Sequence, residues 1–340
     1  MNIIEIDGSQ GEGGGQILRT SLSLAACYGK PIHIRHIRQG RKKPGLMRQH
    51  LACVNAIKQV CNAKVKGTSI GSTEIEFIPA EIQAGDYHYS VGSAGSSTLV
   101  FQTVLPALLL ANKESTLVLE GGTHNPMAPS YDFIKQAFLP VLAQMGIESS
   151  VSIERYGFYP VGAGKWCIKI TPPKSFSKIK IEQRGGLLST QAHCIGAGIP
   201  ENVVVRERKQ LLTRLKWPEQ SIITKKVNSL GSGNIVSLKV SYPKITEVVE
   251  SIGAVGISSE RVANKAVELL HRYQTIGAPV GQYLADQLLL PMVIARGGSF
   301  VTGPLTEHCK TNIAVIRQLT DIEIKVEEIV GKRKWKVRVG

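Results

Sequence analysis

The feature that most limits the fold of this chain is a repeated order of secondary structure. Alternating and helically spaced apolar residues predict a unit of strand, helix, strand, helix, strand and strand. In the first copy the elements are expected at residues 3–7, 16–29, 31–37 and 45–61, and near 63–67 and 73–78. A glycine-rich turn joins the first strand to the first helix. Units of this kind indicate a protein of the α/β class.

The same order returns twice. The second copy is expected at residues 87–91, 96–112, 115–121 and 129–146, and near 150–155 and 165–170. The third copy begins with a strand at 177–183, breaks off, and resumes at residues 281–295, 298–302, 309–319, 322–328 and 334–339. We therefore predict an α/β (α+β) fold. A large domain of three repeated units would span 1–185 and 278–340, with a smaller inserted α/β domain at 186–277.

The charge balance favours a polyanionic partner. The chain has 41 Lys and Arg against 26 Asp and Glu, a formal net charge of +15. Between Gly13 and Thr73 there are eleven basic residues and no acidic one. A solvated surface normally mixes both signs, so this segment indicates phosphate binding, with nucleic acid the first candidate and an acidic membrane surface the second.

Other features restrict the class of protein. The longest apolar stretches, such as 104–111 and 288–295, are too short to cross a bilayer, and residues 1–10 do not resemble a secretory signal. We therefore expect a cytoplasmic protein that does not insert into membranes. The six cysteines form no C-x-x-C pair, which argues against zinc. The chain also lacks a P-loop, and the glycines at 11–15 do not fit the dinucleotide pattern.

The loop Gly8–Gln16 is the first candidate site. Its glycines allow the backbone to approach a phosphate closely, and Arg19 lies one helical turn beyond it. Glu12 is the last carboxylate before a long basic segment, which suits a divalent cation placed between it and phosphate. A tight glycine turn with an exposed glutamate remains the structural alternative.

Three further stretches carry candidate residues. Basic side chains surround Pro44 and Gly45 before a helix, where arginine forks and the helix start would both attract phosphate: Arg38, Arg41, Lys42, Lys43 and Arg48. The small residues 92–98 open another helix, with Gln102 one turn further, either a nucleotide contact or an ordinary surface glutamine. In the loop 121–129, His124 is either catalytic or stabilises the turn.

The stretch Thr306–Asn312 places His308 beside Glu307 between a strand and a helix. Such a histidine can act as a general base, a metal ligand or a nucleophile, and a structural role is equally open. A neutral imidazole attacks phosphorus well and leaves well, which suits a covalent nucleotidyl intermediate. Cys309 is a rival nucleophile.

Taken together, these stretches resemble the RNA 3'-terminal phosphate cyclase family over essentially the whole chain. The segments that carry the resemblance are DGSQGEGGGQILRTSLSLA, RQGRKKPGLMRQHL, VGSAGSSTLVFQTVLPALL, GGTHNPMAPSYDFI, YGFYPVGAG, VGQYLADQLLLPM and TEHCKTNIAVI. The family has a large domain of three repeats, each like the C-terminal domain of a bacterial translation initiation factor, and a small inserted domain. The chain also resembles, more distantly, enolpyruvyl transferases built from the same repeat.

The resemblance implies a role for particular residues. The adenylated histidine of the family corresponds to His308, and the acidic residue near a divalent metal, Mg²⁺ or Mn²⁺, corresponds to Glu12. The ATP contacts correspond to Gln102, Tyr283, Leu284, Ala285, Asp286 and Gln287. The phosphate-binding residues correspond to Arg19, Arg38, Arg41 and Gln49. Tyr156 and Ala163 depart from the family pattern, so no ligand is assigned to that loop.

The activity implied is ATP-dependent conversion of an RNA 3'-phosphate to a 2',3'-cyclic phosphate through an adenylated histidine and an adenylated RNA end. ATP and RNA with a 3'-terminal phosphate would be the partners, and nothing indicates an obligate protein partner. The alternative is a catalytically silent cyclase-like protein that acts in ribosomal RNA processing. Relatives of that kind lack the histidine, which this chain keeps as His308. Enolpyruvyl transfer would need no covalent histidine.

Overall fold

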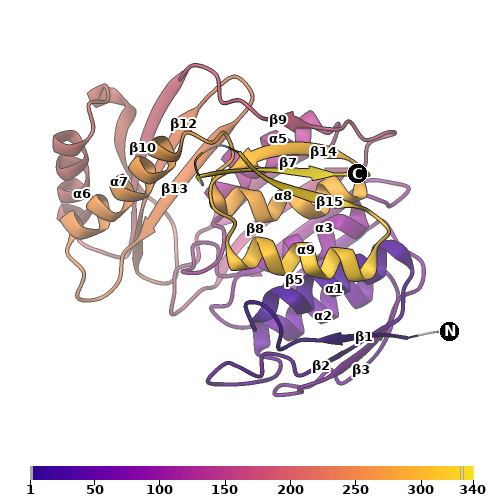
Figure 1. Ribbon diagram of the computed structural model, residues 1–340. Coiled ribbons are helices and arrows are strands. Elements are labelled where there is room, and N and C mark those ends of the chain that lie inside the picture. Colours follow the sequence, from indigo (N-terminus) through magenta and orange to yellow (C-terminus); the bar gives the residue numbers. More distant parts are fainter. Residues whose placement is uncertain (1–2, 330, 332) are drawn as a thin grey trace.

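The computed structural model describes residues 3–329, 331 and 333–340 and is a mixed α/β protein, as predicted (Figure 1). The first unit contains a four-stranded sheet in the order β1-β2-β4-β3. β1 and β2 pair in parallel, whereas β4 pairs antiparallel with β2 and with β3. Its elements are β1 (Ile4–Asp7), α1 (Gly15–Tyr28), β2 (Ile32–Arg35), α2 (Arg48–Val60), β3 (Lys64–Lys66) and β4 (Ile75–Ile78).

The second unit has a sheet in the corresponding order, β5-β6-β8-β7. Its first part consists of β5 (Asp86–Ser90), α3 (Ser97–Leu108) and β6 (Ser115–Gly121). The segment predicted as one helix at 129–146 is divided into α4 (Tyr131–Phe133), a π-helical turn η1 (Ile134–Phe138) and α5 (Leu139–Gln144). Pro140 near the start of α5 explains the wider turn, because proline clashes with the carbonyl of an α-helix one turn earlier. Strands β7 (Glu148–Arg155) and β8 (Gly164–Thr171) complete the unit.

The third sheet has the order β15-β16-β14-β9, so the three sheets share one strand order and one pattern of parallel and antiparallel pairs. Its elements are β9 (Lys180–Ile181), α8 (Gln282–Ile294), β14 (Gly298–Thr302), α9 (Glu307–Leu319), β15 (Ile324–Ile329) and β16 (Lys334–Val339). β9 is much shorter than the predicted strand at 177–183.

The residues between β9 and α8 form a fourth sheet, β11-β10-β12-β13, with two long helices beside it, on the left of Figure 1. These elements are β10 (Ser189–Ala197), α6 (Glu201–Arg214), a short 3₁₀ turn η2 (Glu219–Ser221), β11 (Ile222–Lys226), β12 (Gly233–Ser241), β13 (Thr246–Ile252) and α7 (Ser259–Ile276). Strands and helices are both present in this part, as expected for an inserted α/β segment. The division into domains at 186 and 277 stays a prediction.

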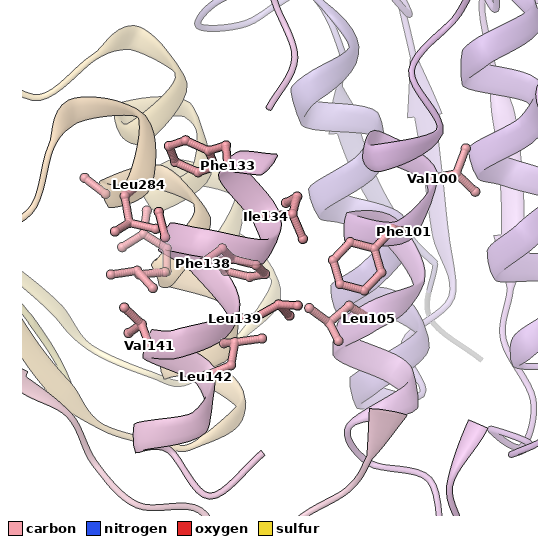
Figure 2. Packing of buried hydrophobic residues seen from close by; sticks show 14 of the residues in the cluster. Val100, Phe101, Leu105, Phe133, Ile134, Phe138, Leu139, Val141, Leu142 and Leu284 are labelled. Atoms are coloured by element: carbon pink, nitrogen blue, oxygen red, sulfur yellow. The ribbon is translucent and has the colours of Figure 1, made fainter. Parts of the chain in front are cut away.

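Helices from all three units pack together in the core. α1 contacts α2, α3 and α9, and α9 also contacts α8, as Figure 1 shows. α3 is apolar on every side, and each of its residues except Gln102 is buried. Figure 2 shows Phe101 and Leu105 of α3 facing the segment with Ile134 and Leu139. This packing fixes the helices relative to one another, and their first turns carry the candidate site residues.

Candidate active site

The glycine-rich loop after β1 lies against the start of α9. The backbone N–H of Glu12 donates to Thr311 Oγ1 at 3.1 Å, although the two residues are 299 positions apart. Gly11 has φ of +57°, and a Cβ there would lie 2.4 Å from the same hydroxyl oxygen. Only glycine allows this approach without strain. The contact brings Glu12 next to the helical turn that carries His308.

Asn312 joins three helices at the same place. Its side-chain oxygen accepts hydrogen bonds from Gln16 Nε2 at 2.8 Å and from the hydroxyl of Thr20, both on α1. Its amide donates to the backbone oxygen of Asp286 on α8 at 3.2 Å. Asn312 is almost fully buried, so these bonds hold the first two turns of α1, α8 and α9 in register. The sequence interpretation assigned no role to Thr311 or Asn312.

Glu12 lies in a pocket of donors. One carboxylate oxygen accepts from the backbone N–H of Gly14 at 2.8 Å, and the other pairs with Arg41. Arg41 also donates to the backbone oxygen of Glu12 at 3.1 Å. The Glu12 side chain is only 14% exposed. The alternative of an exposed turn glutamate is therefore wrong, because Glu12 is largely buried and pairs with Arg41. Its assignment to a metal stays a prediction.

Arg19 reaches the loop from α1, one turn after it. Its guanidinium donates to Gln16 Oε1 at 2.6 Å, and a Cβ on Gly15 would lie 2.8 Å from Nη1. Burial lowers the pKa of Arg19, whereas the negative charges of Glu12 and Asp286 act in the opposite direction. A partly buried guanidinium beside a glycine loop is suited to an anionic ligand.

His50 is a neighbour that the sequence interpretation missed. A Cβ on Gly15 would lie 2.5 Å from its Nε2, and its Nδ1 accepts from the backbone N–H of Met47 at 3.1 Å. Burial, followed by the charges of Arg19 and Arg38, lowers the pKa of His50 to about 3. The ring is therefore neutral, with its proton on Nε2 facing the glycine loop. The position of His50 inside the basic segment between Gly13 and Thr73 is the sequence signal that could have identified it.

Arg38 and Gln49 shape the loops around the site. Arg38 donates to the backbone oxygens of Lys43 at 2.7 Å and Gly45 at 2.8 Å, and burial lowers its pKa. Gln49 accepts from the backbone N–H of Ser96 at 2.7 Å, which links α2 to the loop before α3. Both side chains are thus engaged with backbone groups, and their assignment to phosphate stays a prediction.

The predicted ATP contacts have two kinds of environment. Gln102 is the only residue of α3 that is not buried. Its side-chain amide donates to Gln287 Oε1 at 2.6 Å and so links α3 to α8. Tyr283 is half-exposed at the start of α8. Leu284 and Ala285 are buried in the core, and Figure 2 shows Leu284 beside Phe133. These two residues can meet a ligand only through their backbone.

Asp286 is the most unusual of these contacts. Burial raises the pKa of its carboxyl to about 7, although the charge of Arg19 acts to lower it. Its Oδ1 is buried and has no hydrogen-bond partner within the described part of the chain. An unpartnered buried carboxyl oxygen is costly, so a donor from a ligand would stabilise it.

His308 lies in the first turn of α9, which is capped by Thr306: the Thr306 hydroxyl accepts from the backbone N–H of Cys309 at 3.1 Å. The ring is partly exposed, and the neighbouring Glu307 turns away to pair with Lys310 at 2.7 Å. Cys309 is buried, and burial raises its thiol pKa to about 12. A thiolate is thus not available near neutral pH, which removes Cys309 as a rival nucleophile.

His124 is not part of this site. Its ring is fully buried, hydrogen-bonded to Thr123 and to Asp132 at 3.0 Å, and stacked on Tyr156. It therefore stabilises the turn, which was one of the two predicted roles.

The side chains of Lys42, Lys43 and Arg48 are exposed. No helix among residues 3–329, 331 and 333–340 is both long and apolar enough to cross a membrane.

The first turns of α1, α2, α3, α8 and α9 thus meet around arginines, a neutral histidine and a glycine loop. This arrangement gathers, at one place in an α/β protein, groups whose chemistry suits an anionic ligand. The family model for RNA 3'-terminal phosphate cyclase matches residues 10–326, and the chain belongs to this family.

Two curated relatives are similar over nearly the whole length. The RNA 3'-terminal phosphate cyclase of Ectopseudomonas mendocina (strain ymp) is 43% identical over 327 residues, covering 95% of this chain and 94% of the relative. The RNA 3'-terminal phosphate cyclase of Koribacter versatilis (strain Ellin345) is 43% identical over 329 residues, covering 96% of this chain and 93% of the relative.

Proposed function

We propose that this chain is an ATP-dependent RNA 3'-phosphate cyclase of the ligase class, located in the cytoplasm. The observation that carries the proposal is the position of His308. Thr311 and Asn312, in the same helix and within four residues of it, are hydrogen-bonded to the Glu12 loop, to α1 and to α8. The histidine therefore lies beside both the anion-binding groups and the predicted nucleotide contacts. Family membership and relatives named for this activity support the same conclusion.

In the first step, an imidazole nitrogen of His308 attacks the α-phosphorus of ATP, a P–N bond forms, and pyrophosphate leaves. Arg19 and Arg41 neutralise the charge that develops on the leaving group. Tyr283, Asp286, Gln287 and Gln102 orient the nucleotide from α8 and α3. Asp286 offers its unpartnered Oδ1 as an acceptor.

In the second step, an oxygen of the RNA 3'-phosphate attacks the phosphorus of the bound AMP and releases His308. The product is an RNA end activated as a phosphoanhydride. The vicinal 2'-OH then attacks the 3'-phosphorus, loses its proton, and expels AMP as the ring closes. Because this last attack is intramolecular, proximity supplies much of the acceleration, and the protein needs mainly to hold the end in place.

Glu12 fits a divalent cation, Mg²⁺ or Mn²⁺. Among the residues that the structure describes, there is no group of three or more His, Cys, Asp and Glu side chains arranged to hold a metal. The remaining ligands would then be phosphate oxygens and water, which is how Mg²⁺ commonly binds. The cation would supply charge neutralisation at the triphosphate. A cation at Glu12 would also compete with Arg41 and leave its guanidinium free for phosphate.

The test is mass spectrometry of the protein after incubation with ATP and magnesium. We expect an AMP adduct on the wild-type chain and none on His308→Ala. Cys309→Ala is the matched control, because it removes the adjacent side chain of the same helical turn and should keep the adduct. Labelling of His308→Ala at the wild-type level would refute the assignment. A wild-type chain without any adduct would favour the alternative, a catalytically silent binding protein in ribosomal RNA processing.

A further inference from the structure

A groove of about 750 Å³ lies between the inserted helices and the loop that leads into α9. On one side it is lined by Arg214 at the end of α6 and by His271 and Arg272 near the end of α7. Pro304 and Arg333 line the other side. The groove is therefore formed by two parts of the chain that are separate in the fold.

The groove is strongly basic. Three arginines and a histidine line it, against one carboxylate, Glu268. Arg214, Arg272 and Arg333 are exposed, and within the described residues none of them takes part in a salt bridge. By contrast, Arg206 and Arg208 on the same helix as Arg214 are paired with Glu260 and Glu219.

A structural reason exists for one of these cations. Arg214 lies in the last turn of α6, where a basic residue offsets the negative end of the helix, whereas the last turn of α7 has no basic residue. That reason does not apply to Arg333, which precedes β16 and reaches the groove from the opposite side. Charge that converges from two sides matches a polyanion lying between them.

The groove opens at the edge of the candidate active site. Pro304 is four residues before His308, so the chain between them spans at most about 14 Å. A narrow cavity next to the groove shares Arg272, Ile276 and Pro304 with it and is also lined by Tyr283. The groove and the turn that carries His308 are thus joined by one short stretch of chain.

We propose that this groove holds the RNA backbone that precedes the terminal 3'-phosphate, with Arg214, Arg272 and Arg333 contacting its phosphates. The proposal rests on the proposed function. The ATP phosphates are assigned to the arginines near Glu12, so they do not account for this second basic surface. Positively charged grooves that follow the backbone are the usual means of binding single strands without sequence preference.

The test compares two variants with the same change in charge. Arg214→Gln with Arg272→Gln alters the groove, whereas Lys113→Gln with Lys174→Gln removes two exposed cations, one before β6 and one after β8, that do not line it. The affinity for a 3'-phosphorylated oligoribonucleotide of about ten nucleotides is measured at several salt concentrations. Each lost phosphate contact reduces the slope of log affinity against log salt by about 0.7. For the groove variant, which loses two contacts, we expect the slope to decrease by about 1.4. Equal slopes for the two variants would overturn the proposal.

Two further readouts separate the possible failures. Self-labelling with ATP needs no RNA. If the wild-type chain does not label, the proposed function is refuted. If only the groove variant loses labelling, the groove is not an RNA site. A 3'-phosphorylated dinucleotide is too short to occupy the groove, and we expect its cyclisation to be affected much less than that of the longer RNA. Equal losses for both lengths would overturn the proposal. Arg333→Gln tests it from the other side, with an expected slope change of about 0.7.

Discussion

Replacing Glu247 by glutamine should remove a pH-dependent weakness of the fold. Glu247 lies on β13, is almost fully buried, and accepts a hydrogen bond at 3.1 Å from the backbone N–H of Gly281, the residue that caps α8. Burial raises the pKa of its carboxyl from 4.5 to about 8, although the charge of Arg184 acts to lower it. The side chain is thus protonated in the folded protein near neutral pH.

The magnitude follows from the difference in pKa between the two states. Because the pKa is higher in the folded state, the stabilisation is complete below the unfolded pKa and is lost as the pH rises through the folded value. A shift from 4.5 to about 8 corresponds to a loss of about 3–4 kcal/mol between about pH 5 and about pH 8. Glutamine cannot ionise and keeps an acceptor for Gly281.

The assay is denaturant-induced unfolding of both proteins at about pH 5, 6.5 and 8. The difference in unfolding free energy, variant minus wild type, should increase by about 3–4 kcal/mol over this range. Glu81→Gln, at an exposed position, is the control and should show no such trend. A difference that stays constant with pH would show that Glu247 is ionised in the folded protein, and the reasoning would fail.

Three other predictions concern the site and the loop beside it. Glu12→Ala should slow AMP labelling and weaken its dependence on magnesium concentration; an unchanged magnesium titration would contradict the metal assignment. Replacing Lys42 and Lys43 by alanine should reduce the salt slope of RNA binding by up to about one unit while self-labelling stays nearly unchanged. Ala163 has φ of +53°, so Ala163→Gly should raise the unfolding free energy by about 0.5–1 kcal/mol, as measured by denaturation. A destabilised glycine variant would contradict the last expectation.

Much of the fold could be predicted because its signals are local. Apolar periodicity predicted β6 and β14 at their observed bounds, and it placed α9 within two residues of its start. The short β9 and the π-helical turn were missed for different reasons. β9 pairs with β14 over only two residues, which depends on where the third sheet ends. The π turn depends on how one proline is accommodated inside an apolar helix.

The site residues also fall into two groups: those placed by local spacing, which the sequence predicts, and those placed by long-range packing, which it does not. Arg19 was predicted because one helical turn separates it from the glycine loop, and that spacing is fixed by local geometry. The contacts of Thr311 and Asn312 with the N-terminal loop join residues almost 300 positions apart. Their existence depends on how α1 packs against α9, which no local pattern encodes. Leu284 is buried and Tyr283 is half-exposed, and this difference likewise follows from the packing of α8 against its neighbours.

The buried polar groups of the site cost stability, and a ligand would restore it. Asp286 has an unpartnered oxygen in the interior, and burial lowers the pKa of the partly buried Arg19. Each unsatisfied buried group costs about 1–3 kcal/mol. The starts of several helices add positive partial charge to the same place, and the carboxylate of Glu12 offsets only part of it. A ligand that brings anionic oxygens to the arginines and a hydrogen-bond donor to Asp286 would satisfy both groups at once. We therefore propose that these costs would make the site favour a phosphorylated, donor-bearing molecule such as a nucleotide over a simple anion.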